Sequence, residues 1–255
     1  MNIFPGQCPP ARILEQRVAP EPRQQSLFAD VCSLIRPGSI LEIGSWMGAS
    51  AMAWCEAAIP LNADAKVYCV DTWLGSVEHY LNNEGAWADG EWGFKRLAIE
   101  PYGPTFFDDF LWNVHANGYA DQILPFRADS QSALSLFANQ KLHFDVIYVD
   151  GAHDTYSVFK DVSNALKIVS PDGLICGDDF GWETVRDGLV LAAVVQRVPF
   201  RFLVKGQDFI VLRDRSSSLE TEFIGLGYRR WHPLAPANLF RMPLAILRKL
   251  FTKPV

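Results

Sequence analysis

Short apolar runs alternate with segments of helical periodicity along most of this chain. The apolar runs have the length of strands and cover residues 39–43, 66–70, 123–126, 144–149 and 174–176. The segments with helical spacing cover residues 26–35, 49–59, 106–115, 130–138, 156–169 and 184–195. Strands that are apolar on both faces and alternate with helices predict a parallel sheet covered by helices on both sides. Residues 201–204 and 209–212 predict an antiparallel hairpin at one edge of that sheet.

The segments outside this alternation divide the chain into three parts. Residues 1–37 predict a proline-rich arm and one helix, residues 38–213 the α/β domain, and residues 214–255 a C-terminal extension. The domain carries a long insertion at residues 73–105, which is either a functional loop or lid, or partly disordered. The extension mixes apolar and basic residues, and we expect it to cover the core or to pack in a homodimer, with a membrane surface as the alternative.

The composition limits which substrates and which cellular locations we expect for this protein. The chain has 255 residues, of which 49% are apolar and 20% charged, so it can bury a full core. A formal net charge of -6 argues against nucleic acid as the substrate. The longest clean apolar run, residues 189–195, is too short for a transmembrane segment, and the N-terminus lacks the pattern of a signal peptide. The five cysteines form no CxxC pair, and a reducing cytoplasm fits best.

The strongest local motif follows the first expected strand and reads Leu41-Glu42-Ile43-Gly44-Ser45-Trp46-Met47-Gly48-Ala49-Ser50. In an open α/β sheet, ligands bind where strands end, and glycine there lets the backbone approach a ligand closely. A dinucleotide fingerprint requires glycine where this chain has Trp46, so the turn argues against NAD and FAD. Its form is ExGxxxG, and the acidic Glu42 favours a cationic ligand over a pyrophosphate. A generic strand–turn–helix connection is the alternative interpretation.

Two further strand ends carry polar residues. Asp71 ends the second expected strand, where a carboxylate can accept hydrogen bonds from both hydroxyls of a ribose. An aspartate in that place is also common as the cap of a turn. Asp129 and Ser130 follow the third strand, and either of them could simply cap the next helix.

Carboxylates follow the fourth and fifth strands as well. Asp150 ends the strand at residues 144–149, and Asp178 and Asp179 follow the strand at residues 174–176. The two strand ends should be close in space, where three unpaired carboxylates would repel one another. A divalent cation with oxygen ligands would relieve that repulsion, whereas strand-end caps are the alternative. Because adjacent strand residues point to opposite faces, both members of the pair can reach one metal only if the chain has left the strand by Asp178.

Together, these motifs resemble the class I S-adenosylmethionine-dependent methyltransferases over residues 38–213. A narrower resemblance is to the macrocin-type and cephalosporin-cluster O-methyltransferases. It rests on Val70-Asp71-Thr72-Trp73-Leu74-Gly75, on Asp150-Gly151-Ala152-His153 with Tyr156, and on Gly177-Asp178-Asp179-Phe180 with Trp182. The resemblance implies a Rossmann-like, doubly wound α/β fold with a mostly parallel seven-stranded sheet and an antiparallel edge hairpin. It also implies S-adenosylmethionine and Mg²⁺ as cofactors, and a hydroxyl of a small molecule, such as a sugar, a phenol or a natural-product intermediate, as the acceptor.

The motifs and the resemblance assign the site residues in three groups. The cofactor would contact Glu42, Gly44, Ser45, Gly48, Ser50, Asp71, Thr72, Trp73, Asp129, Ser130 and Asp150, with the turn at residues 128–132 on the adenine. The metal ligands implied by the resemblance are Asp150, Asp178 and Asp179. The catalytic residues would be His153 and Asp150.

His153 lies where the catechol enzymes carry a catalytic lysine, and a neutral imidazole could take the proton of a metal-bound hydroxyl. The alternative is that His153 stacks against the cofactor or caps a turn. This chain departs from the sugar enzymes at Ala152, where they place a second acidic residue proposed as the base. That departure is a further reason to prefer His153.

Two other functions are compatible with the same residues. A metal-dependent hydrolase could use the three aspartates, but it leaves Glu42 and Asp71 unexplained. A non-catalytic module could keep the fold without the reaction. Under the methyltransferase interpretation, the aromatic insertion would close over the acceptor, and His79 within it could reach a substrate. A satellite hydrophobic cluster is the simpler interpretation of its tryptophans.

Overall fold

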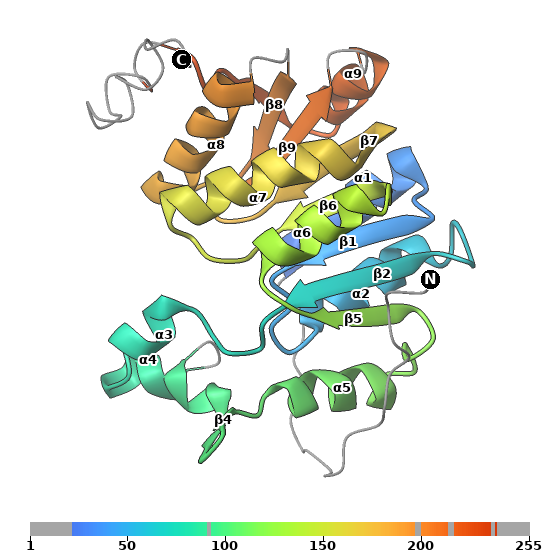
Figure 1. The fold of residues 1–255 in the computed structure, drawn as a ribbon. Helices are drawn as coiled ribbons and strands as arrows, with labels where there is room; N and C mark the ends of the chain where they lie inside the picture. Colours follow the sequence, from blue (N-terminus) through green and yellow to red (C-terminus); the bar gives the residue numbers. More distant parts are fainter. Residues whose placement is uncertain (1–21, 91–92, 197–199, 214–216, 236–237, 239–255) are drawn as a thin grey trace.

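The protein is a three-layer α/β domain (Figure 1). The computed structural model describes residues 22–90, 93–196, 200–213, 217–235 and 238. The proline-rich arm at residues 1–21 and the basic end of the extension at residues 239–255 therefore lie outside the described residues. No helix of the described part is both long and apolar enough to cross a membrane.

The central sheet has the strand order β10-β8-β9-β7-β6-β1-β2-β5. Five neighbouring strands are parallel, namely β7 (Val169–Gly177), β6 (Phe144–Val149), β1 (Ser39–Ile43), β2 (Lys66–Asp71) and β5 (Ile123–Arg127). Three strands are antiparallel to their neighbours, namely β9 (Asp208–Arg213), β8 (Phe200–Lys205) and β10 (Arg229–Trp231). The doubly wound fold with its edge hairpin is thus confirmed. The described sheet has eight strands rather than seven, because β10 of the C-terminal extension pairs with β8.

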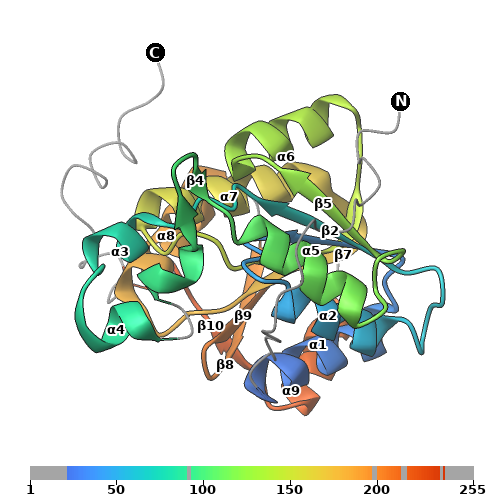
Figure 2. The same ribbon diagram turned by 90° about the horizontal axis from the view of Figure 1, so that it is seen from below.

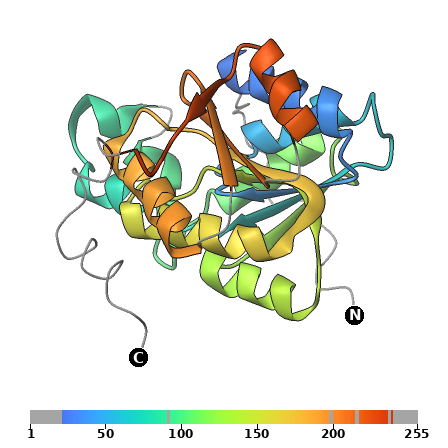
Figure 3. The ribbon, with the colours of Figure 1, turned by 90° about the horizontal axis from the view of Figure 1, so that it is seen from above.

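Helices cover both faces of the sheet, as Figures 2 and 3 show from below and above. One face packs against α6 (Ser130–Asn139), α7 (Thr155–Ile168) and α8 (Glu183–Gln196). The other packs against α1 (Pro22–Ile35), α2 (Ala49–Ala58), α5 (Phe107–Ala116) and α9 (Ser217–Gly225). The strands in the middle are apolar on both faces because each face meets a helical layer, and β1 and β6 are almost wholly buried.

Local sequence signals set where the helices begin. The Asp154 side chain accepts hydrogen bonds from the backbone N–H groups of Tyr156 and Ser157 and so caps α7. Asp129 caps α6 in the same way, through the N–H of Ser132. Helix α2 instead follows Gly48, whose φ of 89° lies in the left-handed region that favours glycine. Two caps and one glycine thereby fix three of the turns at the carboxyl edge of the sheet.

The insertion at residues 73–105 is largely ordered. It contains α3 (Val77–Leu81), α4 (Gly85–Asp89), a 3-10 helix η1 (Phe94–Leu97) and a small hairpin of β3 (Ile99–Glu100) and β4 (Gly103–Pro104). Leu97 is fully buried and packs beside Gly75, so the two ends of the segment meet. The insertion lies beyond the carboxyl end of β2, in the lower left of Figure 1. That position places it at the edge of the sheet where the predicted site residues gather.

Candidate active site

The glycine turn after β1 lies directly against the turn after β6. Gly44 has a φ of 86°, and a Cβ atom placed on it would be 2.1 Å from the carbonyl oxygen of Asp150. The backbone N–H of Asp150 also donates to the carbonyl of Ile43, at 2.9 Å. Only a residue without a side chain permits this approach. The fold therefore joins the predicted cofactor turn, residues 44–48, to the predicted acceptor side of the site.

Asp71 holds the cofactor turn from the adjacent strand. Its Oδ2 accepts hydrogen bonds from the backbone N–H groups of Ser45 and Trp46, at 2.9 and 3.0 Å. Its Oδ1 accepts from the backbone N–H of Trp73 at 2.8 Å. Burial raises the pKa of the Asp71 carboxyl, and these N–H donors oppose the rise. Asp71 thus acts as the turn cap that the sequence offered as an alternative, and ribose binding by Asp71 and Thr72 stays a prediction.

Replacement of Asp71 by asparagine should weaken both folding and cofactor binding. An amide offers one acceptor oxygen, so at least one of the three N–H groups would face an NH₂ group instead of an acceptor. We expect the free energy of unfolding to fall by about 1–3 kcal/mol. Denaturant unfolding measures this, with Asp64→Asn in the exposed turn before β2 as the matched control. An unfolding midpoint equal to that of the unchanged protein would contradict this role of Asp71.

Glu42 lies inside the sheet rather than at its surface. Its side chain is fully buried, and its Oε2 accepts a hydrogen bond from the thiol of Cys69 at 3.4 Å. Burial raises the pKa of Glu42 to about 7, against the opposing effect of the nearby Ser50 and Ser45 hydroxyls. Glu42 thus lies beneath the start of α2 and the cofactor turn, with the Ser50 and Ser45 hydroxyls nearby.

The turn after β5 is occupied by structural hydrogen bonds. Asp129 caps α6, and the Ser130 hydroxyl donates to Asp161 of α7 at 2.5 Å. Gln131 reaches the same Asp161 oxygen from α6, at 3.1 Å. Asp129 thus acts as the helix cap that was the alternative interpretation, and Ser130 instead links α6 to α7. Their contact with an adenine remains a prediction.

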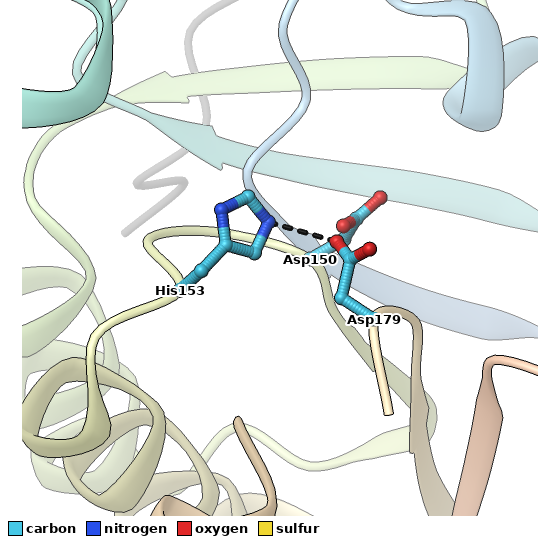
Figure 4. A group of neighbouring side chains, drawn as sticks. All are labelled: Asp150, His153 and Asp179. Atoms are coloured by element: carbon cyan, nitrogen blue, oxygen red, sulfur yellow. Dashed lines mark ion pairs between the residues drawn. The ribbon is translucent and has the colours of Figure 1, made fainter. Parts of the chain in front are cut away.

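Three side chains that could ligate a cation meet beyond the ends of β6 and β7 (Figure 4). One ligand atom from each of Asp150, His153 and Asp179 lies within 4.8 Å of the other two. The His153 Nε2 and Asp179 Oδ2 atoms are 2.8 Å apart, and each side chain keeps about a quarter of its surface exposed, at 28% and 27%. Because ligand oxygens about 2.1 Å from one Mg²⁺ lie about 3–4.2 Å apart, this spacing requires little adjustment. The donor set fits a divalent cation.

Asp178 takes a different direction from its neighbour. The strand ends at Gly177, and Asp179 adopts a left-handed φ of 60°, so the two aspartates no longer alternate as strand residues do. The Asp178 carboxylate accepts from the backbone N–H of Asp179 at 2.6 Å and from the Gln24 side chain of α1 at 3.2 Å. It is 5% exposed. The structure therefore brings Asp150, Asp179 and His153 together and ties Asp178 to α1, and ligation by Asp178 stays a prediction.

The charges in this cluster interact strongly. Burial, followed by the charges of Asp178 and Asp179, raises the pKa of Asp150, whose Oδ2 accepts from the Tyr148 hydroxyl at 3.0 Å. Burial alone would lower the pKa of His153, but the hydrogen bond with Asp179 and the charges of Asp179, Asp150 and Glu78 raise it. A concentration of negative charge that burial penalises is the environment that a cation stabilises.

Three residues beside the cluster were not among the predicted site residues, although Trp182 belongs to a motif that carries the resemblance. Tyr148 points from β6 to Asp150, and Trp182 packs its half-exposed ring 4.9 Å from that of His153. Glu78 of α3 has a buried Oε2 without a hydrogen-bond partner among the described residues, and its charge acts on His153. The hydroxyl-bearing Tyr148, two residues before Asp150 in a strand whose other residues except Asp145 are apolar, was an available signal for one of them. Glu78 carried none, since its position depends on the folding of the insertion.

Comparison with known proteins shows the family of this chain. A family described as a methyltransferase domain matches residues 41–180, and this chain belongs to that family. The match spans β1 to the turn after β7, which includes the cofactor turn and the Asp150, His153 and Asp179 cluster. The prediction of a class I methyltransferase is confirmed. A search of curated proteins gives no match.

Solved structures similar to this one share its fold. An O-methyltransferase from Bacillus cereus in complex with S-adenosylhomocysteine is 20% identical, with 80% of this chain and 83% of that chain covered and a TM-score of 0.50. An S-adenosylhomocysteine-bound methyltransferase from Podospora anserina is 16% identical, with 76% and 79% covered and a TM-score of 0.53. The O-methyltransferase TomG from Streptomyces achromogenes, involved in tomaymycin synthesis and solved with S-adenosylmethionine, is 15% identical, with 76% and 80% covered and a TM-score of 0.53.

Proposed function

We propose that this methyltransferase transfers the methyl group of S-adenosylmethionine to a hydroxyl oxygen of a small molecule, assisted by a divalent cation such as Mg²⁺. The observation that carries the proposal is the convergence of Asp150, His153 and Asp179, with ligand atoms within 4.8 Å, beside the glycine turn. Similar folds in O-methyltransferases solved with this cofactor or its product support it. A natural-product intermediate, a sugar and a phenol are the acceptor classes that we propose.

The cofactor would occupy the carboxyl edge of β1 and β2. The left-handed glycines at positions 44 and 48 bring the backbone close to a ligand there, and Asp71 fixes the main chain between them. Burial raises the pKa of Glu42 to about 7, and a sulfonium or ammonium group above this turn would favour the ionised carboxylate, whereas a pyrophosphate would not.

The acceptor would lie between the cluster and the insertion. Methyl transfer requires the acceptor oxygen in line with the methyl group and about 3–3.5 Å from it. A cation held by Asp150 and Asp179, with Asp178 or His153 as a further ligand, would lower the pKa of the acceptor hydroxyl and fix its orientation. Where Asp178 is that further ligand, His153, which lies 2.8 Å from Asp179, would receive the hydroxyl proton. The ring of Trp182 offers a flat wall, and Glu78 an acceptor for a second hydroxyl or an amine.

Titration calorimetry with S-adenosylmethionine, with Mg²⁺ and with EDTA, tests the cofactor. Micromolar binding in both conditions would support the proposal, since the cation serves the acceptor more than the cofactor. No binding by the folded protein in either condition would overturn it and favour a hydrolase or a non-catalytic module.

Removal of divalent cations should abolish transfer without abolishing cofactor binding. Formation of S-adenosylhomocysteine would be followed over a panel of catechols, sugars and polyketide-like alcohols. With an acceptor that is methylated, we expect EDTA to reduce the rate by about 100-fold or more and added Mg²⁺ to restore it. An equal rate in EDTA and in Mg²⁺ would exclude assistance by the cation and leave methyl transfer itself in place.

A further inference from the structure

The backbone of Trp46 is held in a conformation that is rare for a residue with a side chain. Its φ is 45°, in the left-handed region, and it lies between two glycines of the cofactor turn. Such a conformation costs about 1–3 kcal/mol and persists only where the surroundings fix it. The backbone is fixed on both sides, since its N–H donates to Asp71 and its carbonyl accepts from the Trp73 indole N–H at 2.8 Å.

The side chain of Trp46 is fixed by the insertion. Its ring lies nearly parallel to that of His79 in α3, with centroids 4.8 Å apart and an interplanar angle of 15°. Phe106 contacts the same indole, with centroids 4.7 Å apart at an angle of 44°. The cofactor turn is thus in direct contact with α3, a helix of the insertion.

His79 is itself held in a defined orientation. Its Nδ1 accepts a hydrogen bond from the backbone N–H of Ser76 at 3.0 Å and lies 2.7 Å from the Ser76 hydroxyl, as part of a capping box. Helix α3 has no buried residue, and Val77 and Leu81 are 70% and 76% exposed. Burial of apolar side chains therefore does little to fix α3. Its attachments include the stack of His79 on Trp46 and two contacts of Tyr80, with the Phe94 ring and with the Leu74 carbonyl.

We propose that His79 is a positioning residue for the cofactor. Its stack on Trp46 keeps the glycine turn in the binding conformation and couples the order of α3 to the occupancy of the cofactor site. The next residue toward the N-terminus, Glu78, acts electrostatically on His153 on the acceptor side. One short helix therefore contacts the cofactor turn through His79 and carries a charge that acts on the acceptor side. This inference rests on the proposed use of S-adenosylmethionine.

Two consequences can be measured with S-adenosylhomocysteine as the probe. Loss of the stack should raise the dissociation constant about tenfold in His79→Ala, because a stacked aromatic pair contributes about a tenfold factor to an equilibrium. His79→Phe keeps a ring and should stay within about threefold of the unchanged protein. Binding should also protect the amides of residues 77–82 from hydrogen exchange in the unchanged protein and in His79→Phe, but not in His79→Ala.

His143→Ala is the matched control, because His143 is exposed and precedes β6 at the opposite edge of the sheet. Thermal unfolding checks that each variant folds, and His79→Leu replaces His79→Ala if the latter does not. Equal affinities of His79→Ala and His143→Ala, with equal protection of α3, would overturn the inference alone. If His79→Ala and His79→Phe lose the same affinity for the probe, the effect comes from the hydrogen bond with Ser76. That result would contradict the role of the stacked rings. Folded, unchanged protein that does not bind the probe would overturn the proposed function as well.

Discussion

The substitution Asp179→Asn is expected to lower the rate of methyl transfer about 1000-fold. The affinity of this variant for S-adenosylhomocysteine should equal that of the unchanged protein. The Asp179 carboxylate points into the cluster with Asp150 and His153, and its Oδ2 lies 2.8 Å from His153 Nε2. An amide keeps the size of the side chain but removes the charge that would hold a cation and orient the histidine. Rates of S-adenosylhomocysteine formation and calorimetric affinities, measured on the same preparations, separate these two effects.

Asp172→Asn is the matched control for this substitution. Asp172 is exposed near the start of β7, at the opposite end of the strand from Asp179, so the same loss of charge occurs far from the site. We expect its rate to stay within about twofold of the unchanged protein, because isolated surface substitutions change little. A rate for Asp179→Asn close to that of the control would contradict the role of the cluster. A joint loss of rate and of cofactor binding would show that Asp179 supports the cofactor turn instead.

The sequence predicted most of the sheet because its central strands are apolar on both faces and bounded by strong turns. The strand expected at residues 144–149 is β6 as observed, and the first strand is β1 as observed. The observed ends of helices and strands differ from the expected ones where backbone geometry outweighs the periodicity of apolar residues. Helix α1 begins at Pro22, before the expected start at residue 26, because proline is compatible with the first turn of a helix. Strand β7 begins at Val169, before the expected start at residue 174, and includes Pro171 and Gly173 because an irregular register with β6 accommodates them.

The parts that the sequence left open depend on contacts across long separations. The extension gave no strand signal at Arg229–Trp231, and β10 forms because the edge of β8 is available to pair. The insertion has short helices whose order comes from a few contacts such as Leu97 beneath Gly75. Helices this short have little intrinsic stability, so periodicity alone could not predict them.

The candidate site shows the same division. Strand ends placed Asp150, Asp178 and Asp179 at one edge of the sheet, as topology requires. Side-chain direction could not be predicted, since it follows from the left-handed backbone of Asp179 and from a hydrogen bond between Asp178 and Gln24, 154 positions away. His153, chosen from the resemblance to the catechol enzymes and from the chemistry of imidazole, does lie in the cluster. Its catalytic role stays a prediction.

The glycine turn joins the fold to the site, and this makes Gly44→Ala the most damaging small substitution for stability. A Cβ on Gly44 would lie 2.1 Å from the carbonyl oxygen of Asp150 and 2.7 Å from the Cα of Gly151, both backbone atoms that no rotamer change can move. The added left-handed strain at a φ of 86° makes the cost larger. We expect the free energy of unfolding to fall by about 3–5 kcal/mol in denaturant titrations.

Gly118→Ala separates the strain from the clash, because Gly118 has a φ of 81° and a Cβ there would meet nothing within 4 Å. We expect this control to lose only about 1 kcal/mol. If the two variants were equally destabilised, backbone strain alone would explain Gly44, and the contact between the turns after β1 and β6 would have no special weight. If Gly44→Ala loses more free energy of unfolding than Gly118→Ala, as expected, the contact between the two turns stabilises the sheet. The same contact then also fixes the cofactor turn against Asp150. Displacement of that turn should then abolish S-adenosylhomocysteine binding even under conditions where the variant remains folded.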